Sequence, residues 1–459
     1  MLLLLWLITL AVAQLNSTAF PTNGTVAKNT STSIDPNYDW RQFHYQGIAL
    51  GGWLVLEPYI TPSLFLQFNA TNSSATIPVD EYHFCKQLGH DEAEKQLQQH
   101  WSSWFTEDDF ADIKNYGFNM VRIPIGYWAF HTLDGDPYIK GAADYLDKAL
   151  EWAKNHDLKV WIDLHGVPGS QNGFDSSGYR DIGYPGWFNS TNNVNVTYQV
   201  LNTIFTKYGS GDMAQQYKDT LLGIEIVNEP LGGTLDTNEI KKFFQNAYIN
   251  AGNLMELKNM IVFHDAFQPT SYWNDFLNTS DNVLIDHHKY EVFTEEQQPM
   301  NITEHMNNIK GLAEGISNET HPAVVGEWSA ALTDCTPWLN GVGLGSRYAG
   351  DQPYNFNRTG SCDAINDINS WSKLKRKNTR KFIEMQLDQY ESKMNGWIFW
   401  CYKTETTIEW DFKRLVEYDM FPQPFSNRTY IKNGKDTDSA ASAVNPGWLL
   451  LALALPIIF

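Results

Sequence analysis

Short apolar runs alternate with longer amphipathic stretches along most of this chain. The runs have the length and the continuous hydrophobicity of strands that are buried on both faces. Eight of them are predicted to be strands, at residues 47–55, 119–125, 159–166, 223–230, 259–265, 282–290, 323–329 and 396–403.

Helices are predicted between these runs. In 142–156, apolar residues such as Leu146 and Leu150 recur at helical spacing, and 237–250 and 371–393 are read in the same way. Eight buried strands alternating with helices predict the α/β class, as a single (β/α)8 TIM barrel.

The barrel is expected to occupy residues 41–430 as one catalytic domain. Two long segments, 57–105 and 330–370, follow the first and the seventh predicted strands. Long connections at the C-terminal face of a barrel often carry function. We therefore expect these segments to wall off the barrel mouth, so that it forms a pocket rather than an open cleft. Such a pocket favours attack at the end of a polymeric substrate over attack within it.

Polar residues fall near the C-terminal ends of the predicted strands, where a TIM barrel carries its chemistry. These residues are Arg122, His165, Asn228, Glu229, His288, Tyr290, Glu327 and Trp400. A buried carboxylate is costly unless it is paired or neutralised. Two carboxylates at one barrel mouth, Glu229 and Glu327, are therefore better explained as parts of an active site than as two unrelated surface groups.

Two facing carboxylates are what glycoside hydrolysis requires. Arg122 is expected to hold Glu327 ionised for attack on the anomeric carbon. Glu229 is expected to donate the proton, with its pKa raised by partial burial and by the charge of Glu327. Asn228 offers an amide that can bind the sugar 2-hydroxyl group.

Charge and composition narrow the choice of partner. The formal net charge of −20 repels phosphate backbones, so nucleic acid is not expected as a partner. The chain holds 17 Trp, 22 Tyr and 25 Phe, and aromatic rings with polar tips suit sugar faces as well as core packing. A neutral polysaccharide fits this surface better than an anionic polymer.

Several motifs together resemble glycoside hydrolase family 5, and more narrowly its fungal exo-β-1,3-glucanases. They are GGWLVLEPYITPSLF (51–65), Arg122, DLHGVPGSQNG (163–173), NEP (228–230), HHKY (287–290), GEWS (326–329) and GWIFWCYKTE (396–405). The resemblance spans most of residues 45–425. It implies a monomeric glucan 1,3-β-glucosidase with Glu229 as acid and base and Glu327 as nucleophile.

The same resemblance implies a set of substrate-binding residues. Glu57 and Trp400 would line the terminal-glucose subsite, and Phe174 and Phe293 would clamp the incoming chain. Supporting roles fall to Arg122, His165, Asn228, His288 and Tyr290. This sequence departs from the family pattern at Lys289, where a third His is usual, and at Cys401 and Tyr402.

Alternative functions were weighed on the same residues. A non-catalytic glucan-binding wall protein should lack one carboxylate, but both Glu229 and Glu327 are present. A β-glucan transglycosylase would use the same residues, and β-1,6-glucan is an alternative substrate. No metal or cofactor is expected, because His287 and His288 are strand neighbours that face opposite ways and no phosphate-binding glycine loop occurs.

Four cysteines are present. Cys335 and Cys362 flank a glycine-rich stretch and are the expected disulfide pair. Cys85 and Cys401 would lie near the first and last strands, where they either form a second bridge or remain free thiols.

Both ends of the chain are typical of targeting signals. Residues 1–13 form an apolar run that ends at a small-residue cleavage pattern, as in a signal peptide, and 14–40 form a leader rich in glycosylation sequons. Residues 431–459 are predicted to be a spacer and a signal for a glycosylphosphatidylinositol (GPI) anchor attached near Ser439. These features predict a secreted glycoprotein anchored at the plasma membrane or in the cell wall.

Overall fold

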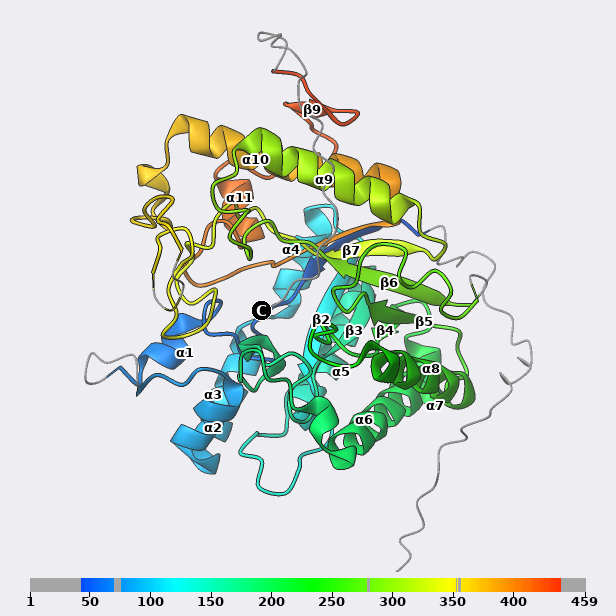
Figure 1. The fold of residues 1–459 in the computed structure, drawn as a ribbon. Coiled ribbons are helices and arrows are strands. Elements are labelled where there is room, and N and C mark those ends of the chain that lie inside the picture. Colours follow the sequence, from blue (N-terminus) through cyan, green and yellow to red (C-terminus); the bar gives the residue numbers. More distant parts are fainter. Residues whose placement is uncertain (1–42, 70–75, 279–280, 352, 354–355, 439–459) are drawn as a thin grey trace, which may run out of the picture.

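The computed structural model describes residues 43–69, 76–278, 281–351, 353 and 356–438. Within them, eight strands close into a parallel barrel in chain order (Figure 1). The strands are β1 (Tyr45–Ala49), β2 (Met120–Gly126), β3 (Lys159–Gly166), β4 (Leu221–Glu225), β5 (Met260–His264), β6 (Val283–His288), β7 (Ala323–Glu327) and β8 (Gly396–Phe399). The predicted (β/α)8 barrel is confirmed.

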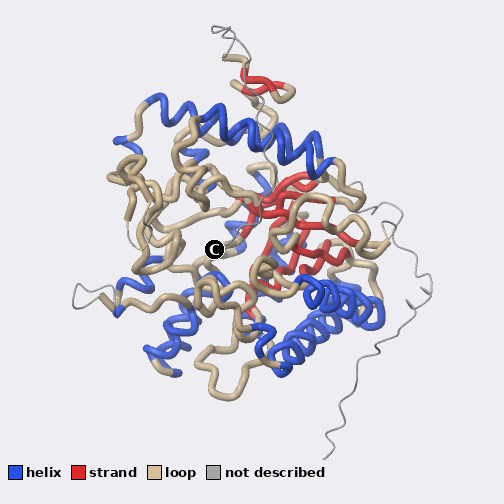
Figure 2. Tube along the Cα trace, in the orientation of Figure 1, coloured by secondary structure: helices blue, strands red, loops and turns tan. Residues whose placement is uncertain are grey.

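Helices surround the barrel on its outer side (Figure 2). The α-helices are α1 (Pro62–Leu66), α2 (Glu81–Leu88), α3 (His90–Ser103), α4 (Glu107–Asn115), α5 (Ala142–Asn155), α6 (Thr191–Gly209), α7 (Gly211–Gln216), α8 (Thr237–Leu254), α9 (Ile302–Ser317), α10 (Lys373–Lys393) and α11 (Phe412–Glu417). Short 3₁₀ turns occupy Tyr127–Ala129, Asp175–Ser177, Trp187–Asn189 and Ile368–Ser370. Neighbouring helices pack in pairs, as α9 and α10 do along one edge of Figure 1.

The three predicted helices all form, with small differences at their ends. Helix α5 buries Leu146, Ala149, Leu150 and Ala153, so its apolar stripe faces the barrel. Helix α8 runs four residues past the predicted end at 250. Helix α10 begins at Lys373 because Ser372 caps it, accepting a hydrogen bond from the backbone N–H of Lys375.

Several strands are shorter than their apolar runs, and the difference is largest for β1, β4 and β8. β1 ends at Ala49 rather than 55, although the chain remains buried through Leu56. β4 ends at Glu225 rather than 230, and the buried residues Ile226 and Val227 follow it. Apolar sequence indicates burial rather than strand structure. These loop segments are as buried as the strands, so the sequence does not distinguish the two.

The strand register places polar side chains side by side at the barrel mouth. Asp163 of β3 is level with Glu225 of β4, and His288 of β6 is level with Glu327 of β7. Neighbouring parallel strands lie about 4.8 Å apart, so residues at one level on the same face are in contact range. The barrel itself therefore brings these side chains together.

The expected disulfide is present. Cys335 and Cys362 are bonded, closing a segment of the long connection between β7 and β8. Cys85 and Cys401 are free and buried, so the alternative of a second bridge is not realised.

The described fold continues past residue 430, where the catalytic domain was predicted to end. A hairpin of β9 (Ile431–Lys432) and β10 (Lys435–Asp436) follows, and the buried Glu384 of α10 accepts hydrogen bonds from the backbone N–H groups of 429–431. The predicted signal peptide at 1–13, the predicted leader at 14–40 and the predicted anchor site at Ser439 lie outside the described residues. None of the helices in the described part of the chain is both long and apolar enough to cross a bilayer.

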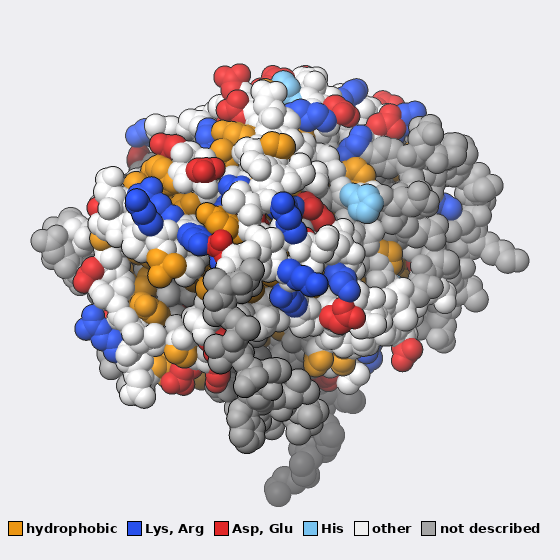
Figure 3. Space-filling view, turned by 90° about the horizontal axis from the view of Figure 1, so that it is seen from above, with side chains coloured by type: hydrophobic (Ala, Val, Ile, Leu, Met, Phe, Trp, Pro, Cys, Tyr) orange, Lys and Arg blue, Asp and Glu red, His pale blue; other side chains and the backbone are white. Residues whose placement is uncertain are grey.

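The surface on the α9 and α10 side is mixed in charge. Figure 3, which views the molecule from above, shows Lys and Arg side chains interspersed with Asp and Glu. The net negative charge of the chain is therefore not gathered on this face.

Candidate active site

Arg122 lies at the centre of the barrel mouth. This buried side chain comes from the middle of β2, and its guanidinium group bonds three residues. Nη1 donates to Oε1 of Glu327 at 2.5 Å, and Nη2 donates to Oε2 of Glu225 at 2.8 Å and to Oδ1 of Asn228 at 2.8 Å. Asp163 lies 3.1 Å away. One buried cation thus orients a carboxylate on each of three different strands.

One further carboxylate lies near this guanidinium, and burial and charge act on the pKa values of the group. Asp286 of β6 lies 4.0 Å from Nε of Arg122. Burial raises the pKa of Glu225 well above its usual range, and the charge of Arg122 only partly offsets the effect. Burial also opposes ionisation of Asp163, but Arg122 and His165 outweigh it and lower its pKa. Arg122 is thus the permanent cation around which these buried acidic side chains gather.

Glu229 lies in the loop after β4, four residues beyond the strand. Its φ of 46° is unusual for a residue that precedes a proline, which indicates a backbone held in place by its surroundings. Its Oε1 lies 2.6 Å from Nδ1 of His288. Burial raises the pKa of Glu229 to about 7, and the charges of Asp163 and Asp265 add to the rise. The expected contribution of Glu327 is smaller than these.

Glu327 is the last residue of β7. Its Oε1 is held by Arg122, and its Oε2 accepts a hydrogen bond from the hydroxyl group of Tyr290 at 2.8 Å. Burial raises its pKa, while the charges of His288 and Arg122 act in the opposite direction. Gly326 precedes it, and a side chain there would collide with the carboxylate of Asp286. Both oxygens of Glu327 are therefore fixed in direction.

A single imidazole nitrogen links the two candidate catalytic groups. Nδ1 of His288 lies 2.6 Å from Oε1 of Glu229 and 3.4 Å from Oε2 of Glu327. These two oxygens can be no further apart than the two distances together, about 6 Å. Retaining glycosidases hold their carboxyl groups about 5–5.5 Å apart and inverting ones about 6.5–9.5 Å. The upper limit favours the retaining arrangement.

An aromatic and polar wall adjoins the carboxylates. The ring of His165 stacks on Trp400, with centroids 5.7 Å apart, and its Nδ1 lies 2.6 Å from Asp163. Nε1 of Trp400 donates to the hydroxyl group of Tyr59 at 2.6 Å. These contacts connect β3, the residue that follows β8 and the loop after β1.

Glu57 is buried near both catalytic candidates. Burial raises its pKa well above the usual range, and the charges of Asp175, Glu327 and Glu229 contribute to the rise. Its Oε1 has no hydrogen-bond partner among the described residues. It therefore offers a polar group to a ligand.

The two proposed clamp residues differ in exposure. The ring of Phe293 is 38% exposed and meets Tyr290 edge-on, with centroids 5.6 Å apart. Phe174 is half-buried in the loop after β3, next to Asp175, whose charge acts on Glu57. The structure thus places both aromatic residues on loops at the site.

Sequence reasoning missed several residues of this site. Asp163, Glu225 and Asp286 are acidic residues inside apolar strands, and that pattern could have identified them as partners of Arg122. Tyr59 and Trp410 carry no comparable signal. Trp410 reaches the site from the loop after β8, where its ring lies 5.1 Å from that of Tyr290.

Two groups of side chains within the described residues have the spacing of a metal site. One is Glu229, His264 and His288, and the other is Glu225, Asp286 and His288, each with ligand atoms within 4.8 Å of one another. The second group surrounds Arg122, whose guanidinium already supplies the positive charge. His287 points away from these groups and pairs with Asp265 at 2.7 Å, as expected for strand neighbours.

Residues 85–340 match the family described as Cellulase (glycosyl hydrolase family 5). The chain belongs to glycosyl hydrolase family 5. A relative in Candida albicans named "Glucan 1,3-beta-glucosidase 2" is 52% identical over 457 residues, covering 94% of each chain. Another in Saccharomyces cerevisiae, "Glucan 1,3-beta-glucosidase I/II", is 50% identical and covers 84% of this chain and 86% of its own.

Solved structures agree on the fold of this family 5 protein. The crystal structure of rutinosidase from Aspergillus niger matches with a TM-score of 0.65, covering 84% of this chain and 99% of that one. The sequence identity is 18%, so the likeness concerns the barrel architecture alone.

Two departures from the family pattern have visible consequences. Nζ of Lys289 pairs with Oδ2 of Asp265 at 3.0 Å, so this lysine replaces a third histidine with an ion pair. Cys401 is a buried free thiol, and its Sγ lies 3.4 Å from the backbone oxygen of Lys403. Neither change touches Glu229 or Glu327.

Proposed function

We propose that this chain is a retaining exo-β-1,3-glucosidase that releases glucose from the non-reducing ends of β-1,3-glucan. The observation that carries the proposal is the contact of Glu229 and Glu327 with the same nitrogen of His288. The family and the names of its close relatives support the choice of substrate.

The first step transfers the terminal glucose to the enzyme. Glu327 attacks the anomeric carbon with one oxygen of a carboxylate group that Arg122 holds through Oε1 and Tyr290 holds through Oε2. The glycosidic C–O bond breaks, and the departing oxygen takes the proton of Glu229. A pKa of about 7 keeps that proton on Glu229 at acidic pH.

The second step regenerates the carboxylates. Glu229, now ionised, takes a proton from water, and the water oxygen attacks the anomeric carbon as the ester bond to Glu327 breaks. Glucose leaves with its configuration retained. Nδ2 of Asn228 is buried without a hydrogen-bond partner among the described residues, so it is available to the sugar 2-hydroxyl group.

The test is incubation of the purified protein with linear β-1,3-glucan while NMR follows the first products. The proposal expects free glucose in the β form before oligosaccharides accumulate. A ladder of oligosaccharides would contradict exo attack, and α-glucose as the first product would contradict retention. Oligosaccharides longer than the substrate would identify transglycosylation, and release from β-1,6-glucan alone would change the linkage.

A matched pair of variants tests the nucleophile. Glu327→Gln should lower kcat at least about a thousandfold, because the amide cannot form the glycosyl ester. Glu314→Gln is the control, since this carboxylate is 62% exposed on α9 and pairs with Lys393. Equal activity of the two variants would remove Glu327 from the mechanism.

We also propose that the mature protein is a secreted, monomeric glycoprotein with a GPI anchor at the cell surface. Ala13 ends an apolar run at a small-residue cleavage pattern, and Ser439 is followed by a short spacer and an apolar tail from Trp448 to Phe459; both patterns support this placement. Release from intact cells by a phosphatidylinositol-specific phospholipase C tests the anchor, and retention after that treatment argues against it.

A further inference from the structure

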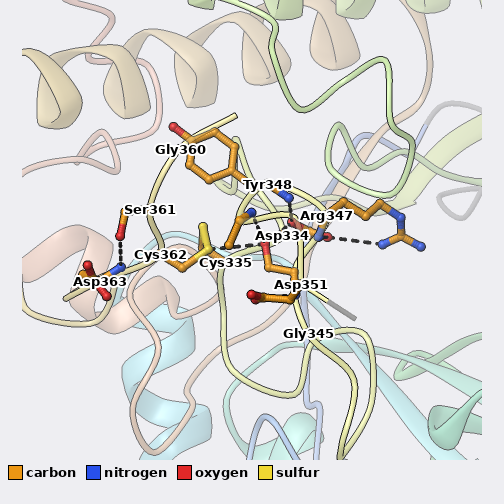
Figure 4. Close-up of a disulfide and its surroundings, with 12 residues drawn as sticks. Asp334, Cys335, Gly345, Arg347, Tyr348, Asp351, Gly360, Ser361, Cys362 and Asp363 are labelled. Atoms are coloured by element: carbon orange, nitrogen blue, oxygen red, sulfur yellow. Dashed lines mark hydrogen bonds and ion pairs between the residues drawn. A yellow bond between two sulfur atoms is a disulfide. The ribbon is translucent and has the colours of Figure 1, made fainter. Parts of the chain in front are cut away.

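A second cavity lies away from the carboxylates, between the connection that follows β7 and the start of α10. Its volume is about 400 Å³, and it is lined in part by Thr333, Tyr348, Ser361, Trp371, Asn378 and Glu409. Figure 4 shows that Tyr348, Ser361 and Asp363 lie around the Cys335–Cys362 disulfide. The disulfide holds one wall of the cavity in place.

Two residues of the cavity wall carry buried polar atoms that have no hydrogen-bond partners among the described residues. Glu409 is 1% exposed, and neither of its carboxylate oxygens has a hydrogen-bond partner in the described part of the chain. Its nearest charge is Nζ of Lys375, 3.6 Å from Oε1. Oγ1 of Thr333 is buried and unpartnered as well. Buried polar groups in folded proteins are nearly always hydrogen-bonded, so these atoms indicate a ligand or bound water.

The chemistry of the lining selects a neutral polyhydroxylated ligand. Glu409 and Asp363 are acidic and Lys375 is the basic residue opposite Glu409, which disfavours an anion. Hydroxyl groups, the amide of Asn378 and the ring of Tyr348 offer the donors, acceptors and apolar face that bind sugars. A volume of this size falls in the range of about 300–1,000 Å³ typical of small-molecule sites.

We propose that this cavity is a second, non-catalytic site that binds a glucosyl residue of the β-glucan substrate. The inference rests on the proposed function, because it takes the substrate from it. A ligand here would lie next to the active-site wall: Glu409 lines the cavity, while the following residue, Trp410, contacts Tyr290 and Phe293 with ring centroids 5.1 and 6.4 Å apart.

Two sites on one protein raise its apparent affinity for a polymer, but not for a monosaccharide substrate. The test fills the cavity with Asn378→Trp. Asn369→Trp is the matched control, because Asn369 is exposed nearby and does not line the cavity. Glu409→Gln is a second variant that keeps the shape and removes the charged acceptor.

Binding is measured in a Glu327→Gln background, as depletion of the full chain from solution by insoluble linear β-1,3-glucan. We expect Asn378→Trp and Glu409→Gln to weaken this binding about fivefold or more and Asn369→Trp to leave it unchanged. With Glu327 intact, all three variants should hydrolyse 4-nitrophenyl β-glucoside with the parent kcat/KM.

The outcomes separate this inference from the proposed function. Unchanged glucan binding by Asn378→Trp and Glu409→Gln would overturn the second site while glucose release by the parent protein still stands. Weaker binding together with lost activity on the aryl glucoside would also overturn it, because the variant would then have disturbed the catalytic site. Failure of the parent protein to release glucose from β-1,3-glucan would instead refute the proposed function.

Discussion

The hydroxyl group of Tyr290 donates a hydrogen bond to Oε2 of Glu327, with 2.8 Å between the two oxygens. A hydrogen bond to a charged group contributes about 1.5–3 kcal/mol. Tyr290→Phe should therefore lower kcat roughly 10- to 100-fold on β-1,3-glucan. The bond orients the nucleophile, so the effect should persist with a small aryl glucoside.

Tyr402→Phe is the matched control for that measurement. The hydroxyl group of Tyr402 is buried without a hydrogen-bond partner among the described residues. Its removal should leave the steady-state constants within about twofold of the parent. If Tyr290→Phe behaves in the same way, the hydrogen bond does not position the nucleophile.

The pH dependence of kcat/KM should show a basic limb near pH 7. Burial raises the pKa of Glu229 to about 7, and the reaction needs this group protonated. Above that pH the rate should fall about tenfold per unit. In Glu229→Gln the remaining activity on an aryl glucoside with a good leaving group should lack this limb.

Asp175→Asn is the control for the pH profile, because burial also raises the pKa of Asp175 to about 7. Asp175 lies outside the proposed proton transfer, so its variant should keep the basic limb. If the basic limb disappears in Asp175→Asn and stays in Glu229→Gln, the titrating group is Asp175, and the assignment to Glu229 is wrong.

Much of the fold could be predicted because a parallel barrel buries its strands on both faces. The apolar runs marked all eight strands, and polar residues within or just after them marked the mouth. The ends of β1 and β4 could not be predicted, because the loops after Ala49 and Glu225 are equally buried. Between β5 and β6 the described residues form turns rather than the helix that strict alternation predicts.

The two carboxylates that meet at the barrel mouth, Glu229 and Glu327, could be predicted from the sequence, but many of the residues around them could not. Glu229 and Glu327 stand out as carboxylates next to apolar runs. Tyr59 and Trp410 look like ordinary core aromatics in the sequence, and only the folding of distant loops brings them to the site. Side-chain contacts between remote segments leave no local pattern.

Arg122→Met should destabilise the protein strongly at neutral pH. The substitution leaves the carboxylates of Asp163, Glu225 and Glu327 buried without their cation. Breaking a buried ion pair in this way typically costs about 3–5 kcal/mol. The free energy of unfolding, measured in guanidinium chloride, should fall by at least that amount.

Lys242→Met is the control for this loss, since Lys242 and Glu239 form an exposed pair on α8. Exposed pairs contribute about 0–1 kcal/mol. A comparable effect of the two substitutions would mean that the guanidinium does not organise the barrel mouth.

Thiol reactivity should report the cysteine arrangement. Cys85 and Cys401 are buried, and burial raises the pKa of both thiols. A thiol reagent such as dithionitrobenzoate should label neither in the folded protein and both after denaturation without reductant. Labelling of four thiols under that condition would contradict the Cys335–Cys362 bond.

Glu229→Gln should stabilise the fold at alkaline pH while it removes activity. The folded-state pKa of about 7 lies above the usual glutamic acid value, so the folded protein binds more protons than the unfolded chain. The stability linked to Glu229 is therefore fully present below about pH 4.5 and is lost as pH rises through 7. Glutamine cannot ionise, so the variant should gain about 3 kcal/mol at pH 8 and nearly nothing at pH 4. Melting temperatures at the two pH values measure this difference, and Glu314→Gln should show none. An equal gain at both pH values would mean that ionisation of the buried Glu229 side chain is not what lowers the stability.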